Sequence, residues 1–159
     1  AAAMGGAVET TSVDLAKRSR ELSTAHFEAN GFSMGNHRLV VMDVFDYFKY
    51  AKKKGLSYDL IVIDPPSFAR NKKRTFSANK DYHKLIAQSL DILSEHGTII
   101  ASTNAANMTV QQFKKQLRKG LGDVSADFVN LQQLPADFTV NPNDPTSNYL
   151  KVYTIKVNK

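Results

Sequence analysis

The sequence of 159 residues contains no cysteine, no tryptophan and no long apolar run. The absence of cysteine excludes a disulfide framework, a thiolate metal site and a cysteine nucleophile within this chain. No apolar stretch approaches the ~18–20 residues that a membrane-spanning helix requires, so we expect no membrane partner. The four histidines show no spacing typical of a metal site, and we expect no bound metal.

The remaining composition is that of a folded domain. Apolar residues make up 42% and charged residues 23%, which is ordinary globular usage and excludes a disordered tail. A chain of this length suits one domain with a substantial core. The formal net charge of +6 permits a polyanionic partner without proving one.

Strand-like and helix-like apolar patterns alternate along the chain. We expect strands at 7–14, 38–43, 58–64, 98–103, 127–134 and 149–157, helices at 14–29, 45–55, 82–93 and 110–121, a polar loop at 67–80 and a helix stop at 95–97. This alternation predicts an α/β fold with an open, mostly parallel sheet and helices on both faces. Within strand 58–64 the run from Leu60 to Ile63 is apolar on both faces, which predicts the interior of a parallel sheet. The last two strands have no helix between them, so they should pair antiparallel.

Residues 1–7 are small and apolar and include the pair Gly5-Gly6. Such a segment is typical of the last turn of a buried helix, with the glycines as its C-terminal stop. We therefore expect these 159 residues to be the back part of a longer protein.

An acidic residue ends three of the expected strands, namely Asp14, Asp43 and Asp64. Ligands of open α/β sheets bind outside the carboxyl ends of the strands. Asp14 could therefore accept hydrogen bonds from ribose hydroxyls, and Asp43 could accept one from an adenine amine. Each could instead cap the helix that follows it, as aspartate does well.

The segment Asp64-Pro65-Pro66-Ser67-Phe68 is the most specific signal in the sequence. Two prolines after a strand-end acid make a stiff loop whose backbone carbonyls point in fixed directions. Such a rim suits an exocyclic amine or a flat ring that must be held still, and Phe68 offers a stacking face. The simpler alternative is a strand stop with a turn cap.

A basic loop follows this segment directly. Its positive residues are Arg70, Lys72, Lys73, Arg74 and Lys80, and the nearby rings are Phe76 and Tyr82. Positive charge beside a strand end suits phosphates, and the rings suit base stacking. The alternative is a solvated surface loop without a ligand.

Four segments in order resemble successive motifs of the class I S-adenosylmethionine-dependent methyltransferases. They are Ser12-Val13-Asp14-Leu15, Met42-Asp43-Val44-Phe45, Asp64-Pro65-Pro66-Ser67-Phe68 and Ala101-Ser102-Thr103-Asn104. The second and third segments more narrowly resemble the bacterial branch that methylates large-subunit (23S) ribosomal RNA. The resemblance covers nearly the whole chain. It implies the Rossmann-like fold of this class, S-adenosylmethionine as cofactor, ribosomal RNA as partner, a cytoplasmic location and a homodimer as one assembly to test.

The resemblance also implies roles for individual residues. Asp14 and Leu15 would bind the ribose of the cofactor, and Asp43, Val44 and Phe45 would bind its adenine. Asp64 would face the methionine end of the cofactor and the target base, with Pro65 and Pro66 shaping the catalytic pocket. The residues that would receive RNA are Ser67, Phe68, Arg70, Lys72, Lys73, Arg74 and Tyr82.

The sequence departs from the family pattern at its start. The family's first strand and its glycine-rich cofactor loop are missing, although in this fold that strand lies between the strands that end at Asp14 and Asp64. We therefore expect residues 1–159 to be part of a methyltransferase catalytic domain. The family also implies an N-terminal RNA-binding domain upstream.

A second departure concerns the target atom. Relatives that methylate cytosine C5 use a cysteine nucleophile near the end of the fourth strand, where this chain has Ser102-Thr103-Asn104. A nitrogen target needs no covalent catalyst, so we favour nitrogen. Three alternatives stay open: C5 methylation with a cysteine outside this chain, methylation of a small molecule or protein, and a non-catalytic RNA-binding module.

Overall fold

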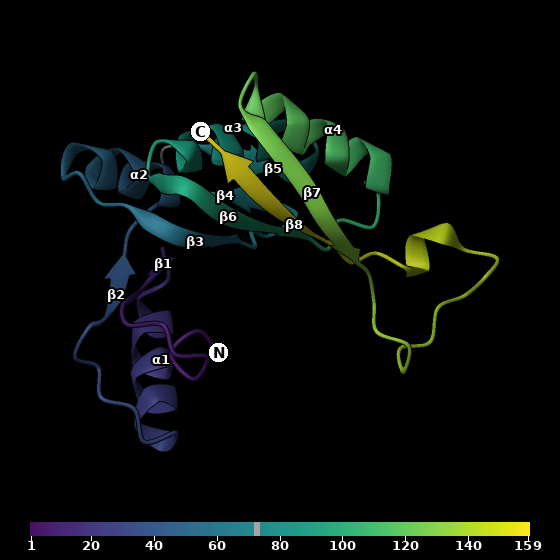
Figure 1. The fold of residues 1–159 in the computed structure, drawn as a ribbon. Coiled ribbons are helices and arrows are strands. Elements are labelled where there is room, and N and C mark those ends of the chain that lie inside the picture. Colours follow the sequence, from purple (N-terminus) through teal and green to yellow (C-terminus); the bar gives the residue numbers. More distant parts are fainter. Residues whose placement is uncertain (72–73) are drawn as a thin grey trace. The chain divides into compact units, whose positions relative to one another are not determined.

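The computed structural model describes residues 1–71 and 74–159, which form two compact units, Ala1–Lys53 and Lys54–Lys159 (Figure 1). Most of the expected elements are present, with boundaries shifted by a few residues. Among the described helices, none combines the length and the apolar character that crossing a bilayer requires.

The N-terminal unit contains a two-stranded parallel sheet of β1 (Thr10–Asp14) and β2 (His37–Val41), with helices α1 (Lys17–Ala29) and α2 (Val44–Lys53). α1 begins at Lys17 rather than at Asp14, because the Asp14 carboxylate accepts a hydrogen bond from the Ala16 N–H in the intervening turn. α1 has no buried residue, whereas α2 buries Phe45, Tyr47, Phe48 and Ala51.

Residues 1–7 have the hydrogen bonds that end a helix. The Gly6 N–H donates to Ala3 O, the Ala7 N–H donates to Ala2 O, and Gly6 has a φ of +91°. This combination is the Schellman motif, which requires a left-handed residue and therefore favours glycine. The expected helix-ending turn is thus confirmed. The side chains are mostly exposed, so the prediction that this turn is buried is wrong.

The C-terminal unit is built on a four-stranded sheet in the order β3-β6-β8-β7. β3 (Tyr58–Ile63) runs parallel to β6 (Leu93–Thr103), whereas β8 (Lys151–Asn158) runs antiparallel to both β6 and β7 (Ser125–Gln132). The expected antiparallel pairing of the last two strands is therefore confirmed.

The other elements of this unit are the strands β4 (Phe68–Arg70) and β5 (Thr75–Ser77), the helices α3 (Ala78–Leu90) and α4 (Val110–Leu121), and the short helix η1 (Pro145–Ser147). α3 and α4 pack against each other at Gly120, where a Cβ atom would lie 2.5 Å from Cβ of Ile86. Only glycine permits this approach. The core contains side chains with no exposed surface, including Phe113, Ile99 and Ile155.

Three expectations for this unit are wrong. β3 is an edge strand of the described sheet rather than an interior strand, and its Leu60 and Val62 are 47% and 62% exposed. Residues 95–97 belong to β6 and not to a helix stop, because the buried Leu93 already pairs with Tyr58. The segment 67–80 is not a plain loop, since it contains the β4–β5 hairpin and the start of α3.

Candidate functional site

Asp64 lies at the carboxyl end of β3, one residue beyond its last paired position. Its Oδ1 atom accepts a hydrogen bond of 2.8 Å from the Ser102 hydroxyl of the neighbouring strand β6. Ser102 is buried, whereas Asp64 is exposed. Oδ2 has no hydrogen-bond partner among the residues that the structure describes. The carboxylate is thus fixed on one side and open to a ligand on the other.

The partnership with Ser102 was not predicted, although a signal for it exists. Ile63 pairs with Ala101 across the parallel strands β3 and β6. The residues that follow these two, Asp64 and Ser102, therefore leave the sheet side by side. A strand-end acid and a strand-end hydroxyl on neighbouring parallel strands would be enough to suggest the bond.

Tyr82 ties the same two strand ends together from inside the core. Its hydroxyl lies 2.8 Å from the carbonyl oxygens of both Ile63 and Ser102 and shares one proton between them. Burial raises the pKa of Tyr82 well above its ordinary value, so the hydroxyl stays a donor at neutral pH. The ring has no exposed surface and packs edge-on against Phe113. The prediction that Tyr82 contacts RNA is therefore wrong, because a ring without exposed surface cannot stack on a base.

The loop after Asp64 leads into the β4–β5 hairpin. Pro65 is half-buried, and Pro66 and Ser67 are exposed. The Ser67 carbonyl accepts a hydrogen bond of 3.0 Å from the Ala78 N–H, which closes the base of the hairpin. The Asp-Pro-Pro segment is thereby held at both ends, by Ser102 at Asp64 and by the start of α3 at Ser67.

The hairpin presents one face to solvent and buries the other. Phe68 and Arg70 lie on the same face of β4, and both are exposed, Phe68 to 61%. Ala69 points to the opposite face, where its cross-strand partner Phe76 is buried. The expected stacking role of Phe76 is therefore wrong, because its ring belongs to the core. Phe68 and Arg70 together offer an exposed ring and a positive charge in the hairpin that follows Asp64 in the chain.

The tip of the hairpin is closed by two hydrogen bonds. The Arg74 N–H donates to the Asn71 side chain at 2.9 Å, and the Asn71 N–H donates to Arg74 O at 3.0 Å. The side chain of Arg74 is half-buried. Lys72 and Lys73, which we expected to contact RNA, lie outside the described residues.

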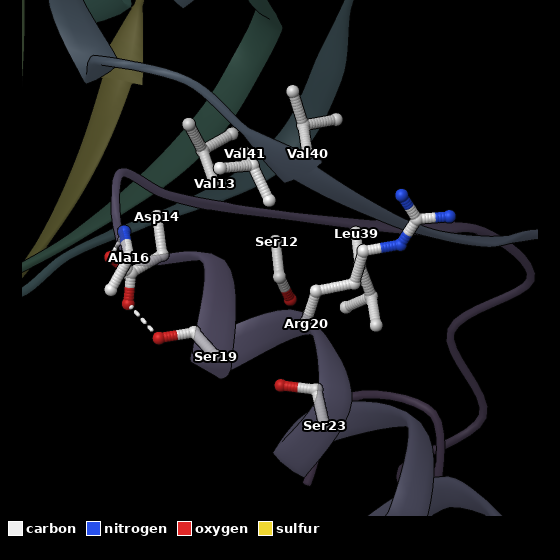
Figure 2. Close-up of a pocket in the computed structure, with 10 residues that line it drawn as sticks. All are labelled: Ser12, Val13, Asp14, Ala16, Ser19, Arg20, Ser23, Leu39, Val40 and Val41. Atoms are coloured by element: carbon white, nitrogen blue, oxygen red, sulfur yellow. Dashed lines mark hydrogen bonds between the residues drawn. The ribbon is translucent and has the colours of Figure 1, made fainter.

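A pocket of about 180 Å³ lies in the N-terminal unit between β1, β2 and the start of α1 (Figure 2). Ser12 points toward α1 from β1, and Ser19 reaches Asp14 from α1. Leu39 and the valines of both strands contribute apolar surface. The pocket thus combines a carboxylate and hydroxyl groups with an apolar wall.

Asp14 is held in an ionised state at the edge of this pocket. Its two oxygens accept hydrogen bonds from the Ala16 N–H at 2.8 Å and from the Ser19 hydroxyl at 2.6 Å. These bonds hold the pKa of Asp14 below its ordinary value of 3.8. The residue that caps α1 is Ala16, so Asp14 is not a simple helix cap. Leu15 is 53% exposed and does not line the pocket.

Asp43 precedes α2 and caps it. Its Oδ1 atom accepts a hydrogen bond of 3.0 Å from the Phe45 N–H, which confirms the cap alternative. Phe45 is buried, and Asp43 and Val44 are half-buried. Accepting this capping hydrogen bond does not prevent the carboxylate from accepting others, because each carboxylate oxygen can accept more than one.

The described residues contain no group of three or more His, Cys, Asp or Glu side chains that could hold a metal ion. In each unit a strand-end aspartate accepts a hydrogen bond from a serine hydroxyl. These pairs are Asp64 with Ser102 in the C-terminal unit and Asp14 with Ser19 in the N-terminal unit.

The sequence and structure were compared with known proteins. Residues 1–152 match the family model of S-adenosylmethionine-dependent methyltransferases. The chain is 44% identical over 158 residues to YwbD of Bacillus subtilis, a candidate ribosomal RNA large subunit methyltransferase, covering 98% of the chain and 40% of YwbD. It is 32% identical over 139 residues to ribosomal RNA large subunit methyltransferase K of Neisseria meningitidis serogroup B, covering 86% and 38%.

The crystal structure of SMU.776, a candidate methyltransferase complexed with SAH, superimposes with a TM-score of 0.95 at 71% identity, covering 98% of this chain and 41% of that one. The chain thus spans about 40% of the length of these relatives. The class I methyltransferase fold expected from the resemblance is confirmed. The chain belongs to the S-adenosylmethionine-dependent methyltransferase family.

Proposed function

We propose that this chain acts in the transfer of a methyl group from S-adenosylmethionine to a base of large-subunit ribosomal RNA. The observation that carries the proposal is the Asp64 carboxylate, fixed by Ser102 at the end of β3 and followed in the chain by a hairpin that exposes Phe68 and Arg70. The names of two relatives support ribosomal RNA as the substrate.

The N-terminal unit would hold the adenosine part of the cofactor, with the ribose at the Asp14 side of its pocket. Its ionised carboxylate, Asp14, suits the ribose hydroxyls, which are hydrogen-bond donors. Leu15 would lie beside the ribose with Asp14. Asp43 would accept from the adenine amine, with Val44 and Phe45 alongside. When bound, S-adenosylmethionine supplies an electrophilic methyl group carried on a sulfonium.

Asp64 would act on the target base. A ring nitrogen already has a lone pair, and an exocyclic amine needs only alignment and a proton acceptor, which the open Oδ2 atom of Asp64 provides. Orientation of the reactants can supply about 7–11 kcal/mol of a barrier. The Ser102 hydroxyl donates a hydrogen bond to Asp64, and the chain contains no cysteine. Together these features favour a nitrogen target over cytosine C5.

The hairpin would receive the RNA. Pro65 and Pro66 stiffen the approach to Asp64, Phe68 offers a stacking surface and Arg70 offers a phosphate contact. The other predicted RNA contacts of this segment are Ser67, Lys72, Lys73 and Arg74.

The same proposal includes a larger catalytic domain. β3 is an edge strand of the described sheet, so its free backbone edge can pair with a further strand. Leu60 and Val62 share one exposed face of β3, which a further element packed on the sheet would cover. We propose that residues outside 1–159 supply this strand, the glycine-rich cofactor loop and an N-terminal RNA-binding domain. We also propose a cytoplasmic location, where ribosomal RNA is found, and the homodimer stays a prediction.

The test compares Asp64, which follows β3, with Asp59, which lies within β3, in the full-length protein. Asp64→Ala should lower methyl transfer to ribosomal RNA by about 10²–10⁴-fold, the contribution of a positioned proton acceptor. RNA affinity at fixed salt should change little, because the phosphate contacts lie in the hairpin. The matched control is Asp59→Ala, since Asp59 also accepts a hydrogen bond from a serine of β6, Ser94, at 3.0 Å, but lies near the opposite end of β3.

Equal turnover in wild type and Asp64→Ala would overturn the role of Asp64. Substrate affinity without salt dependence would indicate a small-molecule or protein substrate, because phosphate contacts give a steep salt slope. Calorimetry with S-adenosylhomocysteine completes the test, since a full-length protein that binds RNA but no cofactor would be a non-catalytic module.

A further inference from the structure

A long connection emerges at the same end of the sheet as Asp64. β8 begins opposite the end of β6, where Lys151 pairs with Thr103, and β7 ends opposite the start of β8. Because β3 runs parallel to β6, the connection 133–150 between β7 and β8 leaves the sheet at the carboxyl ends of β3 and β6 (Figure 1). Connections of this length with little secondary structure are uncommon, and they are usually either functional or linker segments.

A buried lysine anchors this connection. Lys151 is 3% exposed, and its Nζ atom donates to Ala105 O at 2.9 Å and to Tyr149 O at 2.8 Å. No carboxylate pairs with it among the described residues, and burial lowers the pKa of Lys151. The ammonium thus joins the segment that follows β6 to the segment that precedes β8. Burial in this position removes it from water, which costs free energy.

The connection is ordered by its own hydrogen bonds. The Asn148 side chain accepts from the Leu134 N–H at 3.4 Å, which closes the base. The Ser147 hydroxyl donates to Asp144 O at 2.7 Å and accepts from the Asn141 N–H at 2.9 Å. A chain segment held in this way can present a side chain in a fixed position.

The side chain that it presents is aromatic. Phe138 is 50% exposed, and its ring stands at 90° to that of Tyr149, with centroids 6.4 Å apart. The residues 133–150 include no lysine or arginine, but they include Asp137 and Asp144. Contact with RNA through this segment would therefore use ring surface and not phosphate pairing.

We propose that residues 133–150 form a second RNA-contacting segment of the site, in which Phe138 stacks on a base and Lys151 is the positioning residue. The proposal rests on the proposed function, because it needs an RNA substrate at the Asp64 end of the sheet. The two RNA-contacting segments differ in chemistry: the hairpin binds phosphate through Arg70, and the connection binds a base through Phe138.

The experiment measures binding and methylation of large-subunit ribosomal RNA fragments by the full-length protein. Phe138→Ala should weaken RNA binding about 5- to 100-fold, the range of one lost base stack, and leave the salt slope of binding unchanged. Arg70→Ala should instead reduce that slope by about one. Phe138→Tyr should restore affinity, because it keeps the ring. The matched control is Val129→Ala, a truncation of another exposed apolar side chain, in the middle of β7.

Lys151→Met tests the anchor in the same protein. It should raise KM for RNA while the affinity for S-adenosylhomocysteine stays the same, and it should speed amide hydrogen exchange in residues 133–150. If this variant fails to fold, the comparison of Phe138→Ala with Phe138→Tyr still tests the proposal.

Three results would overturn the proposal. Phe138→Ala could match Val129→Ala in affinity, Phe138→Ala could flatten the salt slope, or Phe138→Tyr could bind as weakly as Phe138→Ala. Each of these results would overturn only the role of residues 133–150. If the wild type still methylates ribosomal RNA, the proposed function stands. A wild-type protein that neither binds nor methylates ribosomal RNA would overturn both proposals.

Discussion

The two units of the chain differ in how much of their apolar surface they bury. In the C-terminal unit Tyr82, Phe113 and Ile155 have no exposed surface. In the N-terminal unit α1 buries no residue, and Leu22 is 58% exposed. Both units have the same alternation of strand and helix in the sequence. Apolar residues at helical spacing therefore indicate a face that can be buried. They do not show that the same unit buries it.

The N-terminal caps of α4 and α1 also differ between the two units. α4 begins at Thr109 with a capping box, in which Thr109 accepts from the Gln112 N–H and Gln112 accepts from the Thr109 N–H. The cap residue of α1 is Ala16, which makes no side-chain hydrogen bond. The C-terminal unit is therefore supported by a side-chain cap and by close packing, whereas α1 has no side-chain cap at its start and no buried residue.

Truncation of the central aromatic side chain should give the largest effect. Phe113→Ala should lower the free energy of unfolding by about 3–5 kcal/mol, because it leaves a cavity where the ring of Phe113 packs against Tyr82 and Tyr153. Urea unfolding measures this change, with Val129→Ala as the exposed control. A loss for Phe113→Ala as small as that of the control would mean that the C-terminal unit lacks the tight core described above.

Tyr82→Phe should give the next largest effect, a loss of about 1–3 kcal/mol, because two buried strand-end carbonyls lose their donor. The pKa of Tyr82 is raised in the folded state, so the wild type's advantage is full below the ordinary pKa of 10.0 and shrinks as the pH rises above it. Unfolding curves of both proteins at pH 7 and above pH 10 check this. An advantage that grows with pH would contradict the assigned hydrogen bonds.

The sequence predicted the strand-end acids well, because a strand followed by a helix leaves its last residue at a defined edge. Asp64 and Asp14 are found there. It predicted Tyr82 and Phe76 badly, although Tyr82 shares its helical spacing with the buried Leu85 and Ile86. The pattern that predicted the helix therefore also indicated that Tyr82 lies in the core.

Other features depend on neighbours that no local pattern describes. The edge position of β3 follows from which strands pair with it, and an apolar run such as 60–63 looks the same at an edge and in the interior. β4 and β5 are too short to give a periodic signal. The strand ends suggest a hydrogen bond between Asp64 and Ser102, but the register of β3 against β6 that brings the two residues together comes from the structure.

Removing the cap of α4 and adding a cap to α1 should give smaller effects of opposite sign. Thr109→Ala should cost about 1 kcal/mol, because the first turn of α4 loses its capping oxygen. Ala16→Ser should stabilise α1 by up to about 1 kcal/mol, since it adds the missing acceptor. Hydrogen exchange of the first-turn amides reports both changes. Slower exchange in α4 of Thr109→Ala would contradict the capping box.

Leu22→Ala should have the smallest effect. With 58% of the side chain exposed, the free energy of unfolding of the 159-residue chain should change by less than about 0.5 kcal/mol. A loss comparable to that of Phe113→Ala would mean that α1 has a partner surface within this chain, and the contrast between the two units would disappear.

Nucleoside mass spectrometry tests most directly whether Asp64 marks the site of methyl transfer to RNA. Large-subunit ribosomal RNA from cells that lack the protein is incubated with the full-length enzyme and methyl-labelled S-adenosylmethionine. The expected result is a labelled methyl group on a base nitrogen with the wild type and with Asp59→Ala, and almost none with Asp64→Ala. Unlabelled RNA after incubation with the wild type, or equal label with Asp64→Ala, would contradict the proposed function.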